Sequence, residues 1–272
     1  MKLGCNTLLF NQIDLYGAMQ CISWAGFDGA ELASIVPARH LELNTNQSYI
    51  DEVKSIAIKQ GLELFAIHSE EEGETDAENI KSMAKLCEVA RKLNVPIVAP
   101  FIRRNPGDIE VTKNNYKYVR KLTEQAENQG ITLAIGIHEG TPVENTAMAI
   151  QMLNEIDSPA LGITLDTREI YKAGEDTAET VSRIGRKIVH VYFRDYPYRH
   201  KSGAAPEQEI PGRSQIDFPK TLRYLKKVGY DNAIDVMLKA WTYPILRQME
   251  IAAEARGYLH RCLQELQLSG NQ

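Results

Sequence analysis

Short apolar runs alternate along this chain with longer segments in which apolar residues recur at helical spacing. The apolar runs predict eight β-strands, at residues 2–7, 29–33, 62–68, 95–101, 131–138, 160–166, 187–194 and 232–238. The longer segments predict a helix after each strand, at about 12–25, 48–60, 76–93, 111–129, 143–156, 176–185, 217–228 and 243–266. Eight such units predict an α/β fold, a single (β/α)8 TIM barrel, and no linker or change of composition divides residues 1–272.

Four of the predicted strands separate their residues by face, because side chains alternate along a strand. One face carries nearly all the polar residues, and its members are Gly136, His138, Thr164, Asp166, His190, Tyr192, Arg194, Asp235, Met237 and Lys239. The other face is apolar and is expected to pack under the helices; it carries Leu133, Ile135, Ile137, Ile163, Leu165, Val189, Val191, Phe193, Ile234, Val236 and Leu238. Since TIM barrels place their sites at the carboxyl ends of the strands, we expect a site where the polar ends converge.

Composition narrows the classes of partner. The formal net charge is −5 and Lys and Arg are scattered, which argues against a nucleic-acid-binding surface. No stretch approaches the ~20 apolar residues that span a bilayer, and the amino terminus lacks the features of a signal peptide. The cysteines are far apart and predict reduced thiols: Cys5, Cys21, Cys87 and Cys262. We therefore expect a cytoplasmic protein that binds a small molecule, with no nucleic-acid or membrane partner; a homo-oligomer is compatible with the sequence.

Several segments resemble a known family. They are KLGCNTLLF (2–10), WAGFDGAELA (24–33), IHEGTP (137–142), LDT (165–167), IVHVYFRD (188–195), PGRSQIDF (211–218) and VGYDNAIDV (228–236). Together they resemble the xylose isomerase-like TIM barrels, the sugar phosphate isomerase/epimerase superfamily that includes ketose 3-epimerases, inosose-processing enzymes and endonuclease IV. The resemblance covers nearly the whole chain and implies the barrel fold, but the scaffold supports many chemistries and so does not identify the substrate.

The resemblance also implies a metal site. The family binds Mn, Mg, Co or Zn through Glu, Asp, His and Glu on four strand ends. In this chain those positions hold Gly136, Asp166, Tyr192 and Met237, so one ligand of the four remains. A lone carboxylate does not hold a divalent ion tightly, and phenol and thioether groups are poor ligands for hard cations. We therefore predict no bound catalytic metal and no other cofactor.

Asp166 and Glu169 are the first candidates for catalysis. Glu169 stands where sugar epimerases have a substrate-binding His, and Arg168 and Arg194 are expected nearby. One interpretation is an ion-pair network that replaces the charge of the lost metal. The other is a general base, because a carboxylate without a cation in a water-poor barrel has a raised pKa. Contact between Arg194 and Asp166 would favour the first interpretation.

Lys239 is the third catalytic candidate. Desolvation lowers the pKa of a lysine and frees its amine to attack a carbonyl carbon, as Schiff-base catalysis requires. Its expected surroundings include Trp241 and are unusually apolar for a sugar site. The alternative is a lysine that extends into solvent or pairs with a carboxylate such as Asp235, and Lys172 is a weaker candidate nucleophile.

Eight residues are predicted to line the substrate site: His68, Gly136, His138, His190, Tyr192, Arg194, Met237 and Trp241. His138 and His190 could contact a substrate hydroxyl, or could be held as structural groups by Glu31, Asp235 or Asp195. The long connection 195–216 combines aromatic, basic, Gly and Pro residues and is suited to a lid.

Three functions remain open at this point. The chain could be a metal-free isomerase or epimerase of a small carbonyl or sugar-like ligand, with Asp166 or Glu169 as base and Arg194, Tyr192 or His190 as positioning groups. It could be a diverged or engineered catalyst with an apolar pocket and a reactive carboxylate or Schiff-base lysine. It could also be a catalytically silent protein that binds a ligand or partner.

Overall fold

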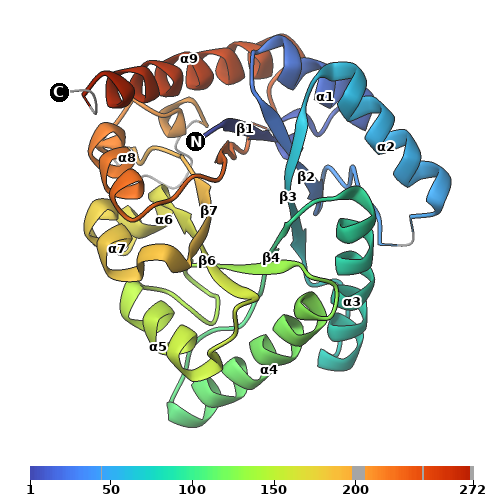
Figure 1. Ribbon diagram of the computed structural model, residues 1–272, viewed down its shortest axis with the longest axis vertical. Coiled ribbons are helices and arrows are strands. Elements are labelled where there is room, and N and C mark those ends of the chain that lie inside the picture. Colours follow the sequence, from blue (N-terminus) through green and yellow to red (C-terminus); the bar gives the residue numbers. More distant parts are fainter. Residues whose placement is uncertain (44, 198–205, 241, 270–272) are drawn as a thin grey trace.

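Eight parallel strands close into a barrel in the computed structural model, which describes residues 1–43, 45–197, 206–240 and 242–269 (Figure 1). The strands pair in chain order and β8 returns to β1. Their bounds are β1 Leu3–Asn6, β2 Gly29–Ser34, β3 Glu63–Glu70, β4 Ile97–Phe101, β5 Thr132–Gly136, β6 Leu161–Asp166, β7 Ile188–Tyr192 and β8 Ile234–Val236. The predicted TIM barrel is thus confirmed, although several strands are shorter than the apolar runs that predicted them.

Helices form a ring around the barrel (Figure 1). The α-helices are α1 Leu15–Trp24, α2 Gln47–Gln60, α3 Asp76–Leu93, α4 Ile109–Glu127, α5 Thr146–Ile156, α6 Thr167–Lys172, α7 Thr177–Ile184, α8 Phe218–Lys227 and α9 Ile245–Ser269. The 3-10 helices are η1 Thr7–Phe10, η2 Gly185–Lys187 and η3 Pro206–Glu209. Only α6 has no counterpart in the sequence prediction, because its six residues are too few to show a helical period. No helix in the described ranges is both long and apolar enough to cross a membrane.

The core lies between the strands and the helices, as the alternation of faces predicts. The residues predicted to face outward belong to this core, with one exception, Val189. The pairing of β6 with β7 shifts register so that Ile163 pairs with Ile188 and Thr164 with His190. This irregularity turns Val189 inward, where it fills the space beside Gly162. The prediction for Val189 was therefore wrong, since strict alternation fails at a bulge.

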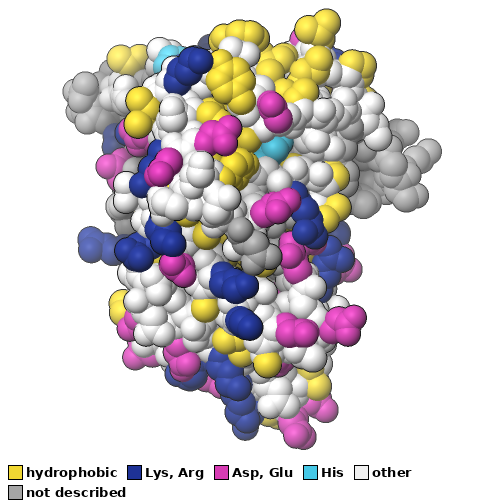
Figure 2. Space-filling view, turned by 90° about the vertical axis from the view of Figure 1, so that its right-hand side faces the viewer, with side chains coloured by type: hydrophobic (Ala, Val, Ile, Leu, Met, Phe, Trp, Pro, Cys, Tyr) yellow, Lys and Arg dark blue, Asp and Glu magenta, His cyan; other side chains and the backbone are white. Residues whose placement is uncertain are grey.

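The outer surface carries charges of both signs. In the face shown in Figure 2, Lys and Arg side chains are interspersed with Asp and Glu over the middle and lower parts, while hydrophobic side chains gather toward the top. The adjacent residues Arg103 and Arg104 are paired with Glu70 and Asp76, respectively. The four cysteines are buried and are not linked as disulfides. The buried thiols agree with the sequence prediction.

Candidate functional site

A pocket opens at the carboxyl ends of the strands. It encloses about 790 Å³, part of which is open to solvent. Most of the predicted site residues line it: His68, Gly136, His138, Asp166, Tyr192, Arg194, Met237 and Lys239. Sequence reasoning predicted His68 on β3 but missed Glu70 on the same strand and Phe101 on β4. The signal for them was the same inward alternation, because Glu70 lies two residues after His68.

Arg194 holds two acidic side chains together at this pocket. Its guanidinium binds Asp166 through two nitrogens, one of them at 3.3 Å, and reaches Glu169 Oε1 at 3.3 Å. A third carboxylate, Glu209, lies 3.7 Å from its Nη1. Arg194 is only 3% exposed, so these contacts take place away from solvent. Asp166 also caps α6, where it accepts hydrogen bonds from the backbone N–H groups of residues 168 and 169.

This geometry favours the ion-pair interpretation of Asp166 and Glu169. Burial alone would raise the pKa of Glu169, but the charges of Arg194, His138 and Arg168 outweigh it and lower that pKa. The same carboxylates raise the pKa of Arg194, which keeps its charge although it is buried. The general-base interpretation required a raised pKa for Glu169, and the lowered pKa argues against it for this residue, because the network supplies compensating cations.

The positions that the resemblance assigns to the family's metal ligands hold groups that do not fit a divalent cation. Asp166 is occupied by the guanidinium of Arg194. Tyr192 donates its hydroxyl to Glu31 at 2.7 Å, and Met237 packs in a small apolar cluster with Leu8. Gly136 supplies no side chain. A neutral phenol, a thioether and one neutralised carboxylate are not a ligand set for Mn or Mg.

His68 presents a neutral ring to the pocket. Burial, with the charge of Lys239 next in size, lowers the pKa of His68 to about 3. Its Nδ1 lies 3.2 Å from the amide nitrogen of Asn6, whose carbonyl accepts from the N–H of Leu8 and so fixes the amide orientation. Because the Asn6 amide donates to Nδ1, the proton of the neutral ring sits on Nε2. His68 can therefore donate a hydrogen bond to a ligand oxygen.

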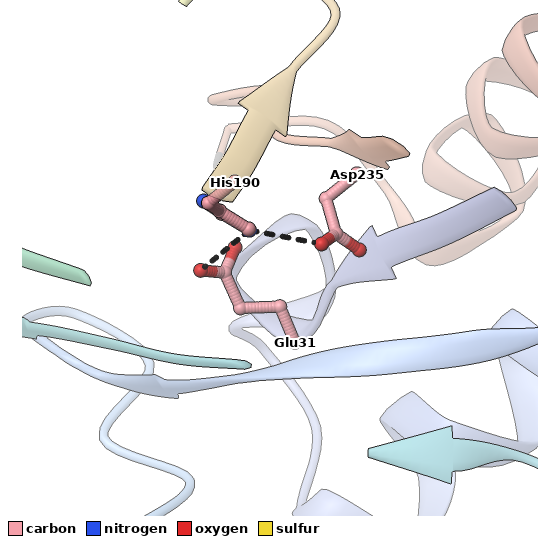
Figure 3. Close-up of side chains that lie close together, drawn as sticks. All are labelled: Glu31, His190 and Asp235. Atoms are coloured by element: carbon pink, nitrogen blue, oxygen red, sulfur yellow. Dashed lines mark hydrogen bonds and ion pairs between the residues drawn. The ribbon is translucent and has the colours of Figure 1, made fainter. Parts of the chain in front are cut away.

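A buried polar cluster lies next to Tyr192, whose hydroxyl donates to one of its members. It consists of Glu31, His190 and Asp235 (Figure 3). His190 Nε2 lies 3.0 Å from Asp235 Oδ2 and 3.6 Å from Glu31 Oε1. His190 is not among the residues that line the pocket, so this structure supports the structural interpretation of His190 through Glu31 and Asp235.

The protonation of Glu31 gives a testable pH dependence. Burial is the largest influence and raises the pKa of Glu31 to about 7, from an ordinary value of 4.5. The folded state then binds a proton more tightly than the unfolded state, so this group removes stability as pH rises from about 4.5 to about 7. With EDTA in the buffer, we expect the free energy of unfolding of Glu31→Gln, relative to that of wild type, to rise by about 1–3 kcal/mol between pH 4.5 and about pH 7. Urea unfolding at several pH values measures it.

Glu63→Gln is the matched control for this prediction, because Glu63 is an exposed carboxylate paired with Lys2. It should leave the pH dependence of wild type unchanged. Parallel pH profiles for Glu31→Gln and wild type would contradict the assignment of a raised pKa to Glu31.

Of the remaining candidates, His138 and Lys239 line the pocket. His138 contacts Phe101 edge-on, and its Nε2 is 3.6 Å from Glu169 Oε2. Lys239 is exposed at the rim, yet the protein atoms around its amine and the charge of Arg194 lower its pKa. Lys172 lies outside the pocket lining and is paired with Glu139 at 2.6 Å. Trp241 lies outside the described residues, as do residues 198–205 of the predicted lid.

Sequence comparisons identify relatives of this chain. The profile of the family described as xylose isomerase-like TIM barrel matches residues 21–262. An uncharacterized protein of Methanocaldococcus jannaschii is 26% identical over 258 residues, which cover 87% of this chain and 83% of that protein. An inosose dehydratase of Lacticaseibacillus casei is 25% identical over 154 residues, 52% of this chain and 51% of that enzyme. The match therefore spans about half the length of the dehydratase.

Solved structures share the fold. A D-tagatose 3-epimerase-like protein superposes with a TM-score of 0.79 at 21% identity, covering 99% of both chains. The IOLI protein, whose crystal structure contains a zinc atom, superposes with a TM-score of 0.80 at 19% identity, covering 97% of this chain and 99% of that one. Some structures of this fold therefore contain a metal ion.

Proposed function

Because the chain belongs to the xylose isomerase-like TIM barrel family, we propose that it is an isomerase or epimerase of a small sugar-like ligand that works without a catalytic metal. Residues 1–272 act as one barrel domain in this proposal. The contact between Arg194 and Asp166 carries it. Asp166 is the one residue that matches the family's metal ligands, and it binds the permanently charged guanidinium of Arg194. The pocket therefore has a positive group of its own.

The proposed reaction is proton transfer at a carbon next to a carbonyl. Lys239, whose lowered pKa makes the neutral amine more accessible, removes the proton from that carbon. The electron pair moves into the carbonyl and leaves negative charge on its oxygen. Arg194 and the Nε2–H of His68 face the same pocket and stabilise this oxygen. Return of a proton to the other face of the same carbon gives an epimer. Return of a proton to the former carbonyl carbon gives an isomer, as the hydroxyl on the first carbon passes its proton to the enolate oxygen and becomes the new carbonyl.

Solvent deuterium exchange tests this function. The relatives suggest a panel of D-psicose, D-tagatose, D-fructose and inosose, incubated in D2O with the protein in excess EDTA. We expect deuterium at the carbon beside the carbonyl, detected by NMR, and a loss of about 100-fold or more in Lys239→Gln. Lys172→Gln is the control, since Lys172 is a nearby lysine outside the pocket lining, and it should exchange at the wild-type rate.

Other outcomes distinguish the alternatives. Exchange that stops in EDTA and returns with Mn would restore the metal-dependent mechanism and overturn the proposal. Borohydride trapping of a ligand on Lys239 would favour the Schiff-base catalyst, which the position of this amine at the pocket also allows. No exchange with any of these sugars, despite ligand binding, would favour the catalytically silent protein.

A further inference from the structure

The buried cluster of Glu31, His190 and Asp235 combines two acids and an imidazole inside the barrel (Figure 3). Its members come from β2, β7 and β8, three strands that meet in the barrel interior. Glu31 and Asp235 are 0% exposed and His190 is 1% exposed. One oxygen from each acid and one nitrogen of the imidazole lie within 4.8 Å of one another. The proposed reaction uses none of these groups.

The hydrogen bonds around His190 indicate which ring nitrogen carries its proton. Thr164 Oγ1 donates its single hydrogen to the carbonyl of Ala134 at 3.3 Å. The same Oγ1 lies 3.4 Å from His190 Nδ1, so it must accept there, and Nδ1 bears the hydrogen. In a neutral ring, Nε2 would then point a lone pair at two carboxylates. The lone pair and the carboxylate oxygens repel each other. A proton or a metal ion between them would remove this repulsion.

The two carboxylates also favour a bound cation. Asp235 Oδ2 faces His190, while Asp235 Oδ1 is buried and has no hydrogen-bond partner among the described residues. Above the raised pKa of Glu31, two ionised buried acids face a single imidazole, which leaves a shortage of positive charge even when the ring is protonated. We propose that Glu31 Oε1, His190 Nε2 and Asp235 Oδ2 bind a divalent transition-metal cation.

The spacing suits such an ion. Metal bonds of about 2.1 Å place neighbouring ligand atoms about 3–3.5 Å apart. The two distances from His190 Nε2, 3.0 Å and 3.6 Å, are close to this range. One imidazole and two carboxylates favour Mn2+, Co2+ or Zn2+ over soft ions. This site is distinct from the family's metal position, because it includes neither Asp166 nor the residue at 136.

Hydrogen bonds from neighbouring side chains fix the orientation of two of the proposed metal ligands. Glu31 is oriented by the Tyr192 hydroxyl at 2.7 Å and by the Asn6 amide at 2.5 Å, and Thr164 orients the imidazole. An ion can approach from the far side of the barrel. A second cavity of about 1130 Å³, part of it open to solvent, is lined by Phe65, Ile97, Val189 and His190 at the amino ends of the strands.

Metal titration tests the site directly. The full-length protein is stripped with EDTA, dialysed, and titrated with Mn2+ and with Zn2+ by calorimetry, and the bound metal is counted by elemental analysis. We expect one ion per chain and an affinity about 100-fold or more lower in Asp235→Asn. Glu31→Gln, which mimics the protonated acid, is a second variant should Asp235→Asn not fold, as judged by circular dichroism.

Asp166→Asn is the control, since it alters the mouth and leaves the buried cluster intact. It should bind the ion with wild-type affinity and stoichiometry. No stoichiometric binding by wild type would overturn the buried site and leave the metal-free function standing. Binding lost in Asp166→Asn but retained in Asp235→Asn would place the ion at the mouth and overturn both the buried site and the metal-free function.

Discussion

Replacing Arg194 by Met is expected to destabilise the protein by about 3–5 kcal/mol. Methionine keeps much of the side-chain volume but removes the charge. Asp166 and Glu169 are 5% and 3% exposed, so both would become buried acids without their principal cation. Removing one partner of a buried ion pair costs the full desolvation of the other. Urea unfolding monitored by circular dichroism measures this loss.

An exposed arginine provides the matched control. Arg213 binds Glu254 through its guanidinium, but the two side chains are 39% and 38% exposed. Arg213→Met should therefore cost no more than about 1 kcal/mol. Adding Asp166→Asn to Arg194→Met should recover part of the lost stability, since it removes one unpaired charge. A loss for Arg194→Met that equals the loss for Arg213→Met would show that the network does not depend on this guanidinium.

The alternation of side chains along strands predicted much of the fold and of the pocket. It placed Asp166, Tyr192 and Arg194 on the inward face, and all three line the pocket. It could not reveal hydrogen-bond partners across the barrel, because alternation gives the face on which a residue lies but not the residue that it contacts. The hydrogen bond from Tyr192 to Glu31 joins residues 161 positions apart in the sequence. The link between Asn6 and His68 escaped prediction for the same reason.

The sequence left two interpretations of Asp166 and Glu169 open, an ion-pair network and a general base. A raised pKa for Glu169 would follow from burial alone, which is only one of the influences on a carboxylate. Arg168 comes next to it in the sequence, but Arg194 and Glu209 reach the same network from other segments. The sign of the shift depends on distances across the fold. The sequence analysis therefore named Asp166, Glu169, Arg168 and Arg194, but it gave neither Glu209 nor the balance of the charges.

Asp195 connects β7 to the segment that carries Glu209. This carboxylate is 0% exposed and accepts hydrogen bonds from five backbone N–H groups, at 2.8–3.1 Å, which belong to Tyr196, Gly212, Ser214, Gln215 and Ile216. The backbone N–H of Asp195 in turn donates to the carbonyl of Glu209 at 2.7 Å. Asp195 thus fixes the turn at residues 212–216 against the end of a strand, next to the network around Arg194.

We expect Asp195→Ala to cost about 3–5 kcal/mol, because it leaves several backbone donors without an acceptor and removes charge-assisted hydrogen bonds. Asp195→Asn keeps one oxygen acceptor and should cost less. Asp217→Ala is the control: Asp217 caps α8 by accepting from the N–H of Lys220 at 2.8 Å, and its loss should cost about 1 kcal/mol. Urea unfolding compares the three variants.

Asp195→Ala should also weaken the contacts of Glu209 with Arg168 and Arg194. Glu209 lies 2.9 Å from Arg168 Nε and 3.7 Å from Arg194 Nη1, so its position affects the charge balance around Arg194. In Asp195→Ala, hydrogen exchange at the backbone amides of residues 212–216 should accelerate more than exchange in the strands. Uniform acceleration would mean that Asp195 contributes only to global stability. Selective acceleration would show that Asp195 holds residues 212–216 in place beside the network around Arg194.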